Sequence, residues 1–168
     1  YFTGALKNQW GCIPRHDRIL LHRYLDELIV ELNTVLKPKI SIMDGISAME
    51  GRGPVNGRRI QLDILLGSRD PVAIDATAMR IVGLDPEKAR HVVLASQRGL
   101  GKFLPEEIEP CGDTNCRFDI QPATLEWTVR AMNFLTRYEF FTNRILLNDK
   151  IFGAGKRTVG LLRRFGLS

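Results

Sequence analysis

Residues 60–82 read IQLDILLGSRDPVAIDATAMRIV and contain the clearest change of pattern in the chain. Apolar and polar residues alternate over 59–66, which is the period of a strand with one solvent-facing side. Asp70 then supplies a carboxylate that can cap a helix, and Pro71 suits the first helical turn because no amide donor is needed there. We therefore predict a strand over 59–66 and a helix from Pro71 to about Val82.

The residues before this stretch predict a helix, a strand and a loop. Leucines recur at helical spacing over 17–37, and Pro38 ends that pattern. A short buried strand is expected over 39–44. The glycine-rich segment 45–57 is expected to be a loop, and it holds no clear helix. The direction of the strand at 59–66 relative to the one at 39–44 therefore stays open.

The residues after it predict a helix over 86–97, a third short strand over 107–111 and a long amphipathic helix over 124–147. The resulting fold class is α/β, with a small mixed or parallel sheet packed with helices and a long C-terminal helix. Residues 1–147 are expected to form one α/β domain that is part of a larger one. Residues 148–168 are expected to form a basic tail.

Composition narrows the class of protein. The 168 residues contain no run of about 20 apolar residues, so no membrane span is expected. Three cysteines, an odd number, favour a reducing compartment, and the expected location is cytoplasmic. The formal net charge of +5 is concentrated in 144–168, and the rest of the chain is neutral. Nucleic-acid binding is therefore disfavoured.

The glycine-rich segment is the first candidate site. Asp44 ends a predicted strand, and the carboxyl ends of parallel strands are where α/β proteins bind ligands. Together with Glu50 it could hold a cation or act in catalysis, while nearby residues could bind an anion, namely Gly45, Gly51, Arg52 and Gly53. The alternative is a surface loop in which Asp44 makes a turn hydrogen bond and the other charges are solvated.

Four residues outside that segment are further candidates. Asp70 could help to bind a ligand at the helix start, or it could be an N-cap and nothing more. Asp75 lies inside the predicted helix, where a carboxylate is either exposed or placed in a cleft. Lys7, if partly desolvated, could act as a base or bind an anion beside Asn8, and the alternative is an ordinary surface lysine.

No complete metal motif appears in the sequence. Cys111 and Cys116 have four residues between them, and two thiolates do not complete a zinc or iron–sulfur site. Cys12 could contribute only if the fold brings it close. The three histidines show no paired ligand spacing and are interpreted as surface or packing residues. Metal ligands and cofactors therefore stay unknown at this level.

Several segments together resemble the domain of unknown function 362 family. In order and spacing they cover about residues 3–112, and they are 3–8, 11–14, 42–54, 70–76 and 98–101. The resemblance implies that the chain corresponds to the C-terminal portion of such a protein. It also implies a link to ferredoxin-type iron–sulfur segments, although this chain has no four-cysteine motif. The family supplies no reaction.

Two functional hypotheses follow. The first is a redox-associated enzyme domain that binds a small anionic or metal-chelated ligand, with Asp44, Glu50 and Lys7 as its catalytic candidates. The second is an interaction module that docks to an iron–sulfur electron carrier through the basic, aromatic C-terminal segment. Electrostatic steering of that kind would weaken with salt.

Overall fold

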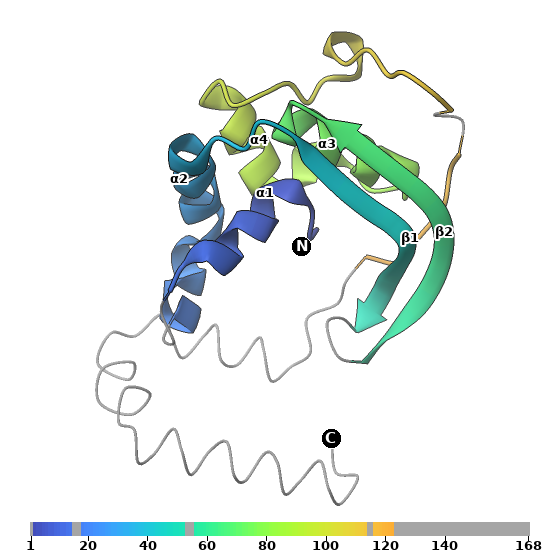
Figure 1. Ribbon diagram of the computed structural model, residues 1–168. Coiled ribbons are helices and arrows are strands. Elements are labelled where there is room, and N and C mark those ends of the chain that lie inside the picture. Colours follow the sequence, from blue (N-terminus) through green and yellow to red (C-terminus); the bar gives the residue numbers. More distant parts are fainter. Residues whose placement is uncertain (1, 15–17, 53–55, 114–115, 123–168) are drawn as a thin grey trace, which may run out of the picture. The chain divides into compact units, whose positions relative to one another are not determined.

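Figure 1 shows the computed structural model, which describes residues 2–14, 18–52, 56–113 and 116–122. The chain divides into two compact units, residues 1–14 with 24–125 and residues 15–23 with 126–168. The described residues of the second unit, 18–23, belong to the 3-10 helix η2, Arg18–Tyr24. The first unit holds the other described elements, and its strands and helices confirm the α/β class.

The described sheet is a two-stranded hairpin of β1, Ser41–Arg52, and β2, Asn56–Ser68. The strand direction left open by the sequence is antiparallel, which differs from the mixed or parallel sheet that was expected. Met43 pairs with Leu66 near one end and Glu50 pairs with Arg58 near the other. The predicted loop over 45–57 was wrong, because most of that segment lies in the strands. Glycine assists the pairing at Gly45, where a Cβ atom would lie 2.5 Å from Ile64 Cγ1.

Four α-helices are described in the first unit: α1, Ala5–Asn8; α2, Leu25–Leu36; α3, Pro71–Ile81; and α4, Arg90–Gln97. The helix predicted over 71–82 is confirmed. The helix predicted over 17–37 is a 3-10 turn followed by α2, which ends where Lys37 takes a left-handed φ of 43°. The helix predicted over 86–97 begins as the 3-10 helix η3, Pro86–Lys88, and continues as α4.

The remaining described connections are short. The 3-10 helix η1, Gln9–Cys12, follows α1, and the 3-10 helix η4 spans Pro105–Glu107. The third strand predicted over 107–111 was wrong, since residues 108–111 have no regular structure. Pro105 precedes this segment and Pro110 lies within it, and a proline cannot donate an amide hydrogen bond to a neighbouring strand.

The core has a helical part and a sheet part. Leu6, Val72 and Val92 are fully buried among α1, α3 and α4, which contact one another or α2. On the inner face of the hairpin, Leu62 packs with Ile81 and Val82 at the end of α3, and residues 116–120 add Phe118 and Ile120 to that cluster. The α3 helix therefore joins the two parts of the core.

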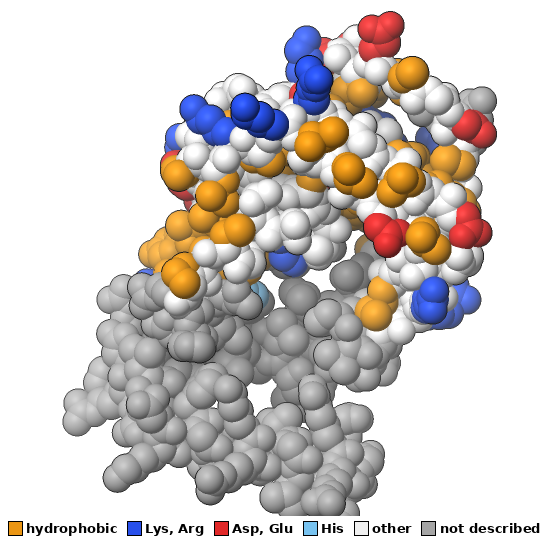
Figure 2. All heavy atoms as spheres, in the orientation of Figure 1, with side chains coloured by type: hydrophobic (Ala, Val, Ile, Leu, Met, Phe, Trp, Pro, Cys, Tyr) orange, Lys and Arg blue, Asp and Glu red, His pale blue; other side chains and the backbone are white. Residues whose placement is uncertain are grey.

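The outer face of the hairpin carries exposed apolar side chains. Ile42 is 69 % exposed and Leu65 71 % exposed, and both face away from the buried Leu62. Figure 2 shows hydrophobic side chains on this side of the molecule interspersed with acidic and basic ones.

The long helix predicted over 124–147 and the basic tail over 148–168 lie outside the described residues, as does Gly53. Among the described helices, none is long and apolar enough to cross a membrane.

Candidate functional site

Asp75 is fully buried on α3 and binds the start of α1. Its carboxylate accepts the amide of Ala5 at 2.6 Å and that of Leu6 at 3.1 Å. Gly4 lies so close that any Cβ there would overlap with this carboxylate. Burial raises the pKa of Asp75 to about 6, although the two amides and His91 favour the ionised form. The carboxylate thus caps a helix that is distant in sequence.

Asp70 caps its own helix and also holds a later loop. Its Oδ1 accepts the amides of Val72 and Ala73, both at 2.8 Å, so the predicted N-cap is confirmed. Its Oδ2 accepts the amide of Lys102 at 2.8 Å. A Cβ on Gly101 would overlap with this carboxylate, which explains why a glycine stands there.

Glu50 holds the segment after residue 115 against the hairpin. Its side chain is 3 % exposed, forms an ion pair with Arg58, and accepts the Gln121 amide at 2.7 Å. The amide of Gln121 is the main cause that lowers the pKa of Glu50, and Arg58 adds to it. Gly51, with a left-handed φ of 74°, donates its amide to the Gln121 carbonyl at 3.4 Å. Glu50 therefore links the hairpin to the segment at Gln121, and we call this contact the Glu50 clip.

Asp44 lies on the same strand as Glu50, but the two do not form one site. Asp44 is exposed, and its Oδ1 accepts the amide of Ile46 at 2.9 Å, where the register shifts between Gly45 and Ser47. Six positions of extended strand separate the two carboxylates by roughly 20 Å. A single cation cannot bind both. This contact of Asp44 is the local, turn-type hydrogen bond that the sequence offered as the alternative to a ligand site.

The other sequence candidates are dispersed. Arg52 pairs with Asn56 in the hairpin, and its side chain lies outside the description. Asn8 is exposed at the end of α1, and its amide donates to Gly4 O at 3.1 Å. Lys7 and Asp75, in contrast, both lie around α1, beside groups that sequence reasoning had not selected.

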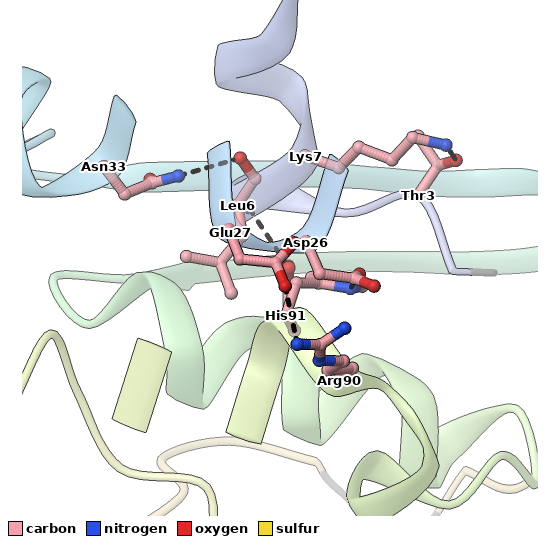
Figure 3. Close-up of polar contacts among 9 residues, drawn as sticks. Thr3, Leu6, Lys7, Asp26, Glu27, Asn33, Arg90 and His91 are labelled. Atoms are coloured by element: carbon pink, nitrogen blue, oxygen red, sulfur yellow. Dashed lines mark hydrogen bonds and ion pairs between the residues drawn. The ribbon is translucent and has the colours of Figure 1, made fainter. Parts of the chain in front are cut away.

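A pair formed by buried His91 and partly exposed Asp26 lies next to α1. His91 at the start of α4 is 2 % exposed, and its Nδ1 lies 3.3 Å from Oδ1 of Asp26 on α2. The hydrogen bond from the His91 side chain is the main cause that lowers the pKa of Asp26, and the His91 amide acts in the same direction. Within the described part of the chain, the Nε2 atom of His91 is buried and has no hydrogen-bond partner. Figure 3 shows Asp26 and His91 side by side.

Lys7 of α1 and Asn33 of α2 lie near this pair, and we call the four residues Asp26, His91, Lys7 and Asn33 the buried polar centre. Lys7 is partly buried with its Nζ 3.4 Å from the Thr3 hydroxyl, and desolvation lowers its pKa against the opposing charge of Asp26. Asn33 donates to the carbonyl of Leu6 at 2.9 Å and to that of Ile29 at 2.8 Å. Figure 3 shows Asn33 of α2 directed at the carbonyl of Leu6, and the Lys7 side chain extending from α1 to Thr3.

A pocket of about 250 Å³ opens beside the Asp–His pair. Three basic residues and one acid line it together with an aromatic and an alanine, namely Lys88, Arg90, His91, Asp26, Phe2 and Ala89. Sites for drug-sized ligands have about 300–1,000 Å³, so this pocket suits a small ligand. A buried histidine paired with an aspartate at the wall of a pocket is the arrangement expected of a catalytic or binding site.

A second hollow, of about 350 Å³, lies beside α3 between η4 and the segment at 116–117. Arg80 in its wall already donates to the Phe103 carbonyl, and burial lowers its pKa while Glu106 opposes that shift. Its other walls are largely apolar, and it lacks a buried acid–base pair among the residues that line it.

The cysteines do not gather into a metal site. Cys12, Cys111 and Cys116 are all free thiols, and the first two are exposed. Across the described ranges, no group of three or more histidine, cysteine, aspartate or glutamate residues is placed to hold a metal ion.

Sequence signals for the buried polar centre were weak. Asp26 falls on the polar side of the leucine pattern over 17–37, and no histidine spacing singled out His91. Asp26 and Glu27 are two acidic residues in the first turn of a helix, a pattern that is typical of a helix N-terminus. That pattern gives no indication of a histidine partner.

Comparisons with known proteins agree with the resemblance noted in the motifs. No solved structure matches the chain. The thylakoid-associated protein sll1697 of Synechocystis is 34 % identical over 106 residues, which cover 59 % of this chain and 32 % of that protein. The chain thus spans about a third of the length of this relative. Residues 1–80, the N-terminal part of this chain and less than the 3–112 suggested by the motifs, match the sequence model of the family described as a domain of unknown function (DUF362).

Proposed function

We propose that the first unit is part of an enzyme domain in which Asp26 and His91 exchange a proton with a small ligand held in the 250 Å³ pocket. One observation carries the proposal: His91 is buried with Nδ1 on Asp26 and with no partner for Nε2 among the described residues. When the imidazole is neutral, Asp26 keeps its proton on Nδ1, and Nε2 carries the lone pair that can accept a proton. Because Nε2 is buried, the ligand must displace the atoms that cover it before this transfer can occur. An aspartate orients a catalytic histidine in this way in many hydrolases.

The neighbouring groups have supporting roles in this proposal. Lys7, with its lowered pKa, is a second base or an anion-binding group. Asp75 accepts a hydrogen bond from the backbone amide of Leu6, and Asn33 donates one to the Leu6 carbonyl. Together they fix α1 in place and so position Lys7. Asp44, Glu50 and Asp70 take no part in this proposal, because none of them lines the pocket. They accept backbone amides, and Glu50 also pairs with Arg58.

The first test is the tautomer of His91, read from its imidazole ¹⁵N shifts by NMR. The proposal expects the Nδ1–H tautomer in the neutral ring, and it expects Asp26→Asn to redistribute the proton between the nitrogens. Arg98→Ala, which removes a surface ion pair with Glu31 between the same two helices, is the control and leaves the tautomer unchanged. A wild-type ring with its proton on Nε2 would block the proposed base and contradict the proposal.

The second test is ligand binding, followed through the same His91 signals. A library of small polar compounds, charged and neutral, is added to the wild-type chain, and at least one class should shift the His91 resonances. The Asp26→Asn variant should respond more weakly to the same compound. If no compound moves His91 while the fold is intact, the pocket is not a ligand site.

We also propose that the chain is a portion of a DUF362 protein and that its longer parent is associated with an iron–sulfur segment. The match of residues 1–80 and the partial coverage of the cyanobacterial relative support the first part. The second part rests on the family resemblance, and a visible absorption spectrum of the anaerobically purified parent tests it. Thiolate-bound iron–sulfur clusters are coloured, and a colourless, iron-free parent would contradict the association.

Docking to an acidic electron carrier is the second candidate function. It rests on the basic segment 144–168, which lies outside the described residues. Binding to a ferredoxin should weaken as ionic strength rises. Affinity that is insensitive to salt would count against this role.

For the location we propose the cytoplasm, supported by the odd number of cysteines. The relative is named a thylakoid-associated protein, which makes attachment to a membrane surface the competing proposal. Fractionation of cells that contain the parent protein separates the two proposals. Parent protein that stays with the membranes after a salt wash would overturn the cytoplasmic location.

A further inference from the structure

The cations at the pocket are held by acids that lie outside it. Arg90 lines the pocket, and its Nη2 atom lies 2.5 Å from Oε1 of Glu27. Lys88 also lines the pocket, and its Nζ atom lies 3.8 Å from Oδ2 of Asp85. Neither Glu27 nor Asp85 is among the residues that line the pocket. Each cation therefore belongs both to a surface ion pair and to the pocket.

These ion pairs are weak enough to be exchanged. Arg90 is 65 % exposed and Glu27 43 %, and Lys88 is 83 % exposed. Exposed pairs contribute little because water and salt screen them. The acid inside the pocket, Asp26, is already engaged by His91. An incoming anion would therefore meet two cations with weakly held partners and no free carboxylate among the lining residues.

We propose that the pocket binds an oxyanion, a carboxylate or a phosphate, and that the guanidinium of Arg90 exchanges Glu27 for this ligand. The inference rests on the proposed function, because it supplies the ligand on which Asp26 and His91 act. Arg90 suits the role since a guanidinium presents a planar fork of donors that matches the two oxygens of a carboxylate or phosphate. Glu27 is then a built-in competitor that lowers the affinity.

The placement of the exchange is consistent with the proposed chemistry. Arg90 and His91 are consecutive residues at the start of α4, so a ligand bound to the first lies beside the second. The two helices that carry these groups also carry the Arg98–Glu31 pair, at 3.1 Å, which lies away from the pocket. That second pair is a matched control within the same interface.

The experiment titrates the 168-residue chain with inorganic phosphate and, separately, with malonate, and follows Arg90 Nε and the His91 ring by NMR. Wild-type protein should bind at least one of the two. Arg90→Ala should weaken binding by about ten-fold, the loss of one charge-assisted contact. Glu27→Gln should strengthen it by about two- to five-fold, because the competitor is gone. Arg98→Ala and Glu31→Gln should leave the affinity unchanged.

Each outcome decides the inference. Binding of malonate without phosphate assigns a carboxylate, and the reverse assigns a phosphate. Equal affinity in wild type and Arg90→Ala, or weaker binding in Glu27→Gln, overturns the exchange. If neither anion binds but a neutral compound shifts His91, the oxyanion inference fails while the proposed function stands. If no compound shifts His91, both fail.

Discussion

At the scale of single residues, three carboxylates bind backbone amides of segments that are distant in sequence. Asp75 holds α1, Asp70 holds the loop at Lys102, and Glu50 holds the segment at Gln121. A carboxylate that accepts amide hydrogen bonds satisfies donors that burial would otherwise leave without partners. The sequence suggested that these positions belong to a ligand or catalytic site, and in the structure all three carboxylates accept backbone hydrogen bonds.

The titration of Asp75 gives a prediction about stability. Its pKa is about 6 in the folded chain and 3.8 is the ordinary value, so the folded state holds this proton more tightly than the unfolded state does. The protonated Asp75 therefore contributes fully to the free energy of unfolding in acid. This contribution of about 3 kcal/mol is lost as pH rises from about 4 to about 6. The lowered pKa values of Asp26 and Glu50 act in the opposite direction.

Urea unfolding of wild type and Asp75→Asn at several pH values between about 4 and 7.5 isolates this contribution. The other groups titrate in both proteins, so the difference in the free energy of unfolding reports Asp75. Relative to the variant, wild type should lose stability with rising pH and then level off. Parallel pH profiles in the two proteins would show that Asp75 is not perturbed.

Gly101 gives a second prediction at this scale. Alanine there would collide with the Asp70 carboxylate, which caps α3. Gly101→Ala should lower the free energy of unfolding by about 2 kcal/mol, since the cap must shift or be lost. Gly67→Ala is the control, because the nearest atom to its added Cβ would be Ser41 O at 4.0 Å. Equal effects of the two substitutions would contradict this reading.

At the scale of elements, local signals were sufficient for α3 but not for β1. Asp70 and Pro71 adjoin the helix that they start, so the sequence predicted its beginning correctly. The extended conformation of 45–52 depends instead on pairing with β2, in which Gly45 fits against Ile64. Glycine content alone indicated a loop, since sequence patterns do not report a partner strand.

The clip made by Glu50 predicts a local effect. Glu50→Ala removes the acceptor of the Gln121 amide and the partner of Arg58. Hydrogen exchange at Gln121 should speed up by about ten-fold or more, because the segment loses an anchor to the hairpin. Asp44→Ala, on the same strand, should leave that amide unchanged. A similar rate in both variants would show that the Gln121 segment is held by other contacts.

At the scale of the whole molecule, the α/β class and the helical spans followed from periodicity, whereas the site did not. Asp26 and His91 are brought together by the packing of α2 against α4, and no local pattern encodes that packing. The sequence suggested Lys7 as a lysine that could be partly desolvated, and it does lie partly buried. Sequence therefore anticipated individual members of the buried polar centre but not its composition.

The two faces of the hairpin give a prediction about the core. Leu62 is 7 % exposed and packs on Ile81, while Leu65 on the same strand is 71 % exposed. Leu62→Ala should lower the free energy of unfolding by about 2–5 kcal/mol and Leu65→Ala by less than about 0.5 kcal/mol. Denaturant titration of both variants measures this. A larger loss in Leu65→Ala would mean that the register of β2 is shifted by one residue.

The carboxylate contacts also bear on how the chain reaches its native state. The Asp75 hydrogen bonds span 70 and 69 residues, and the Glu50 bond to Gln121 spans 71. Contacts between such distant parts must overcome a large loop-closure entropy before they contribute anything, and they slow folding. In pulse-labelled refolding, the amides of Ala5 and Gln121 should gain protection after those inside α3. During synthesis of this protein, α1 would be held loosely until α3 has been made.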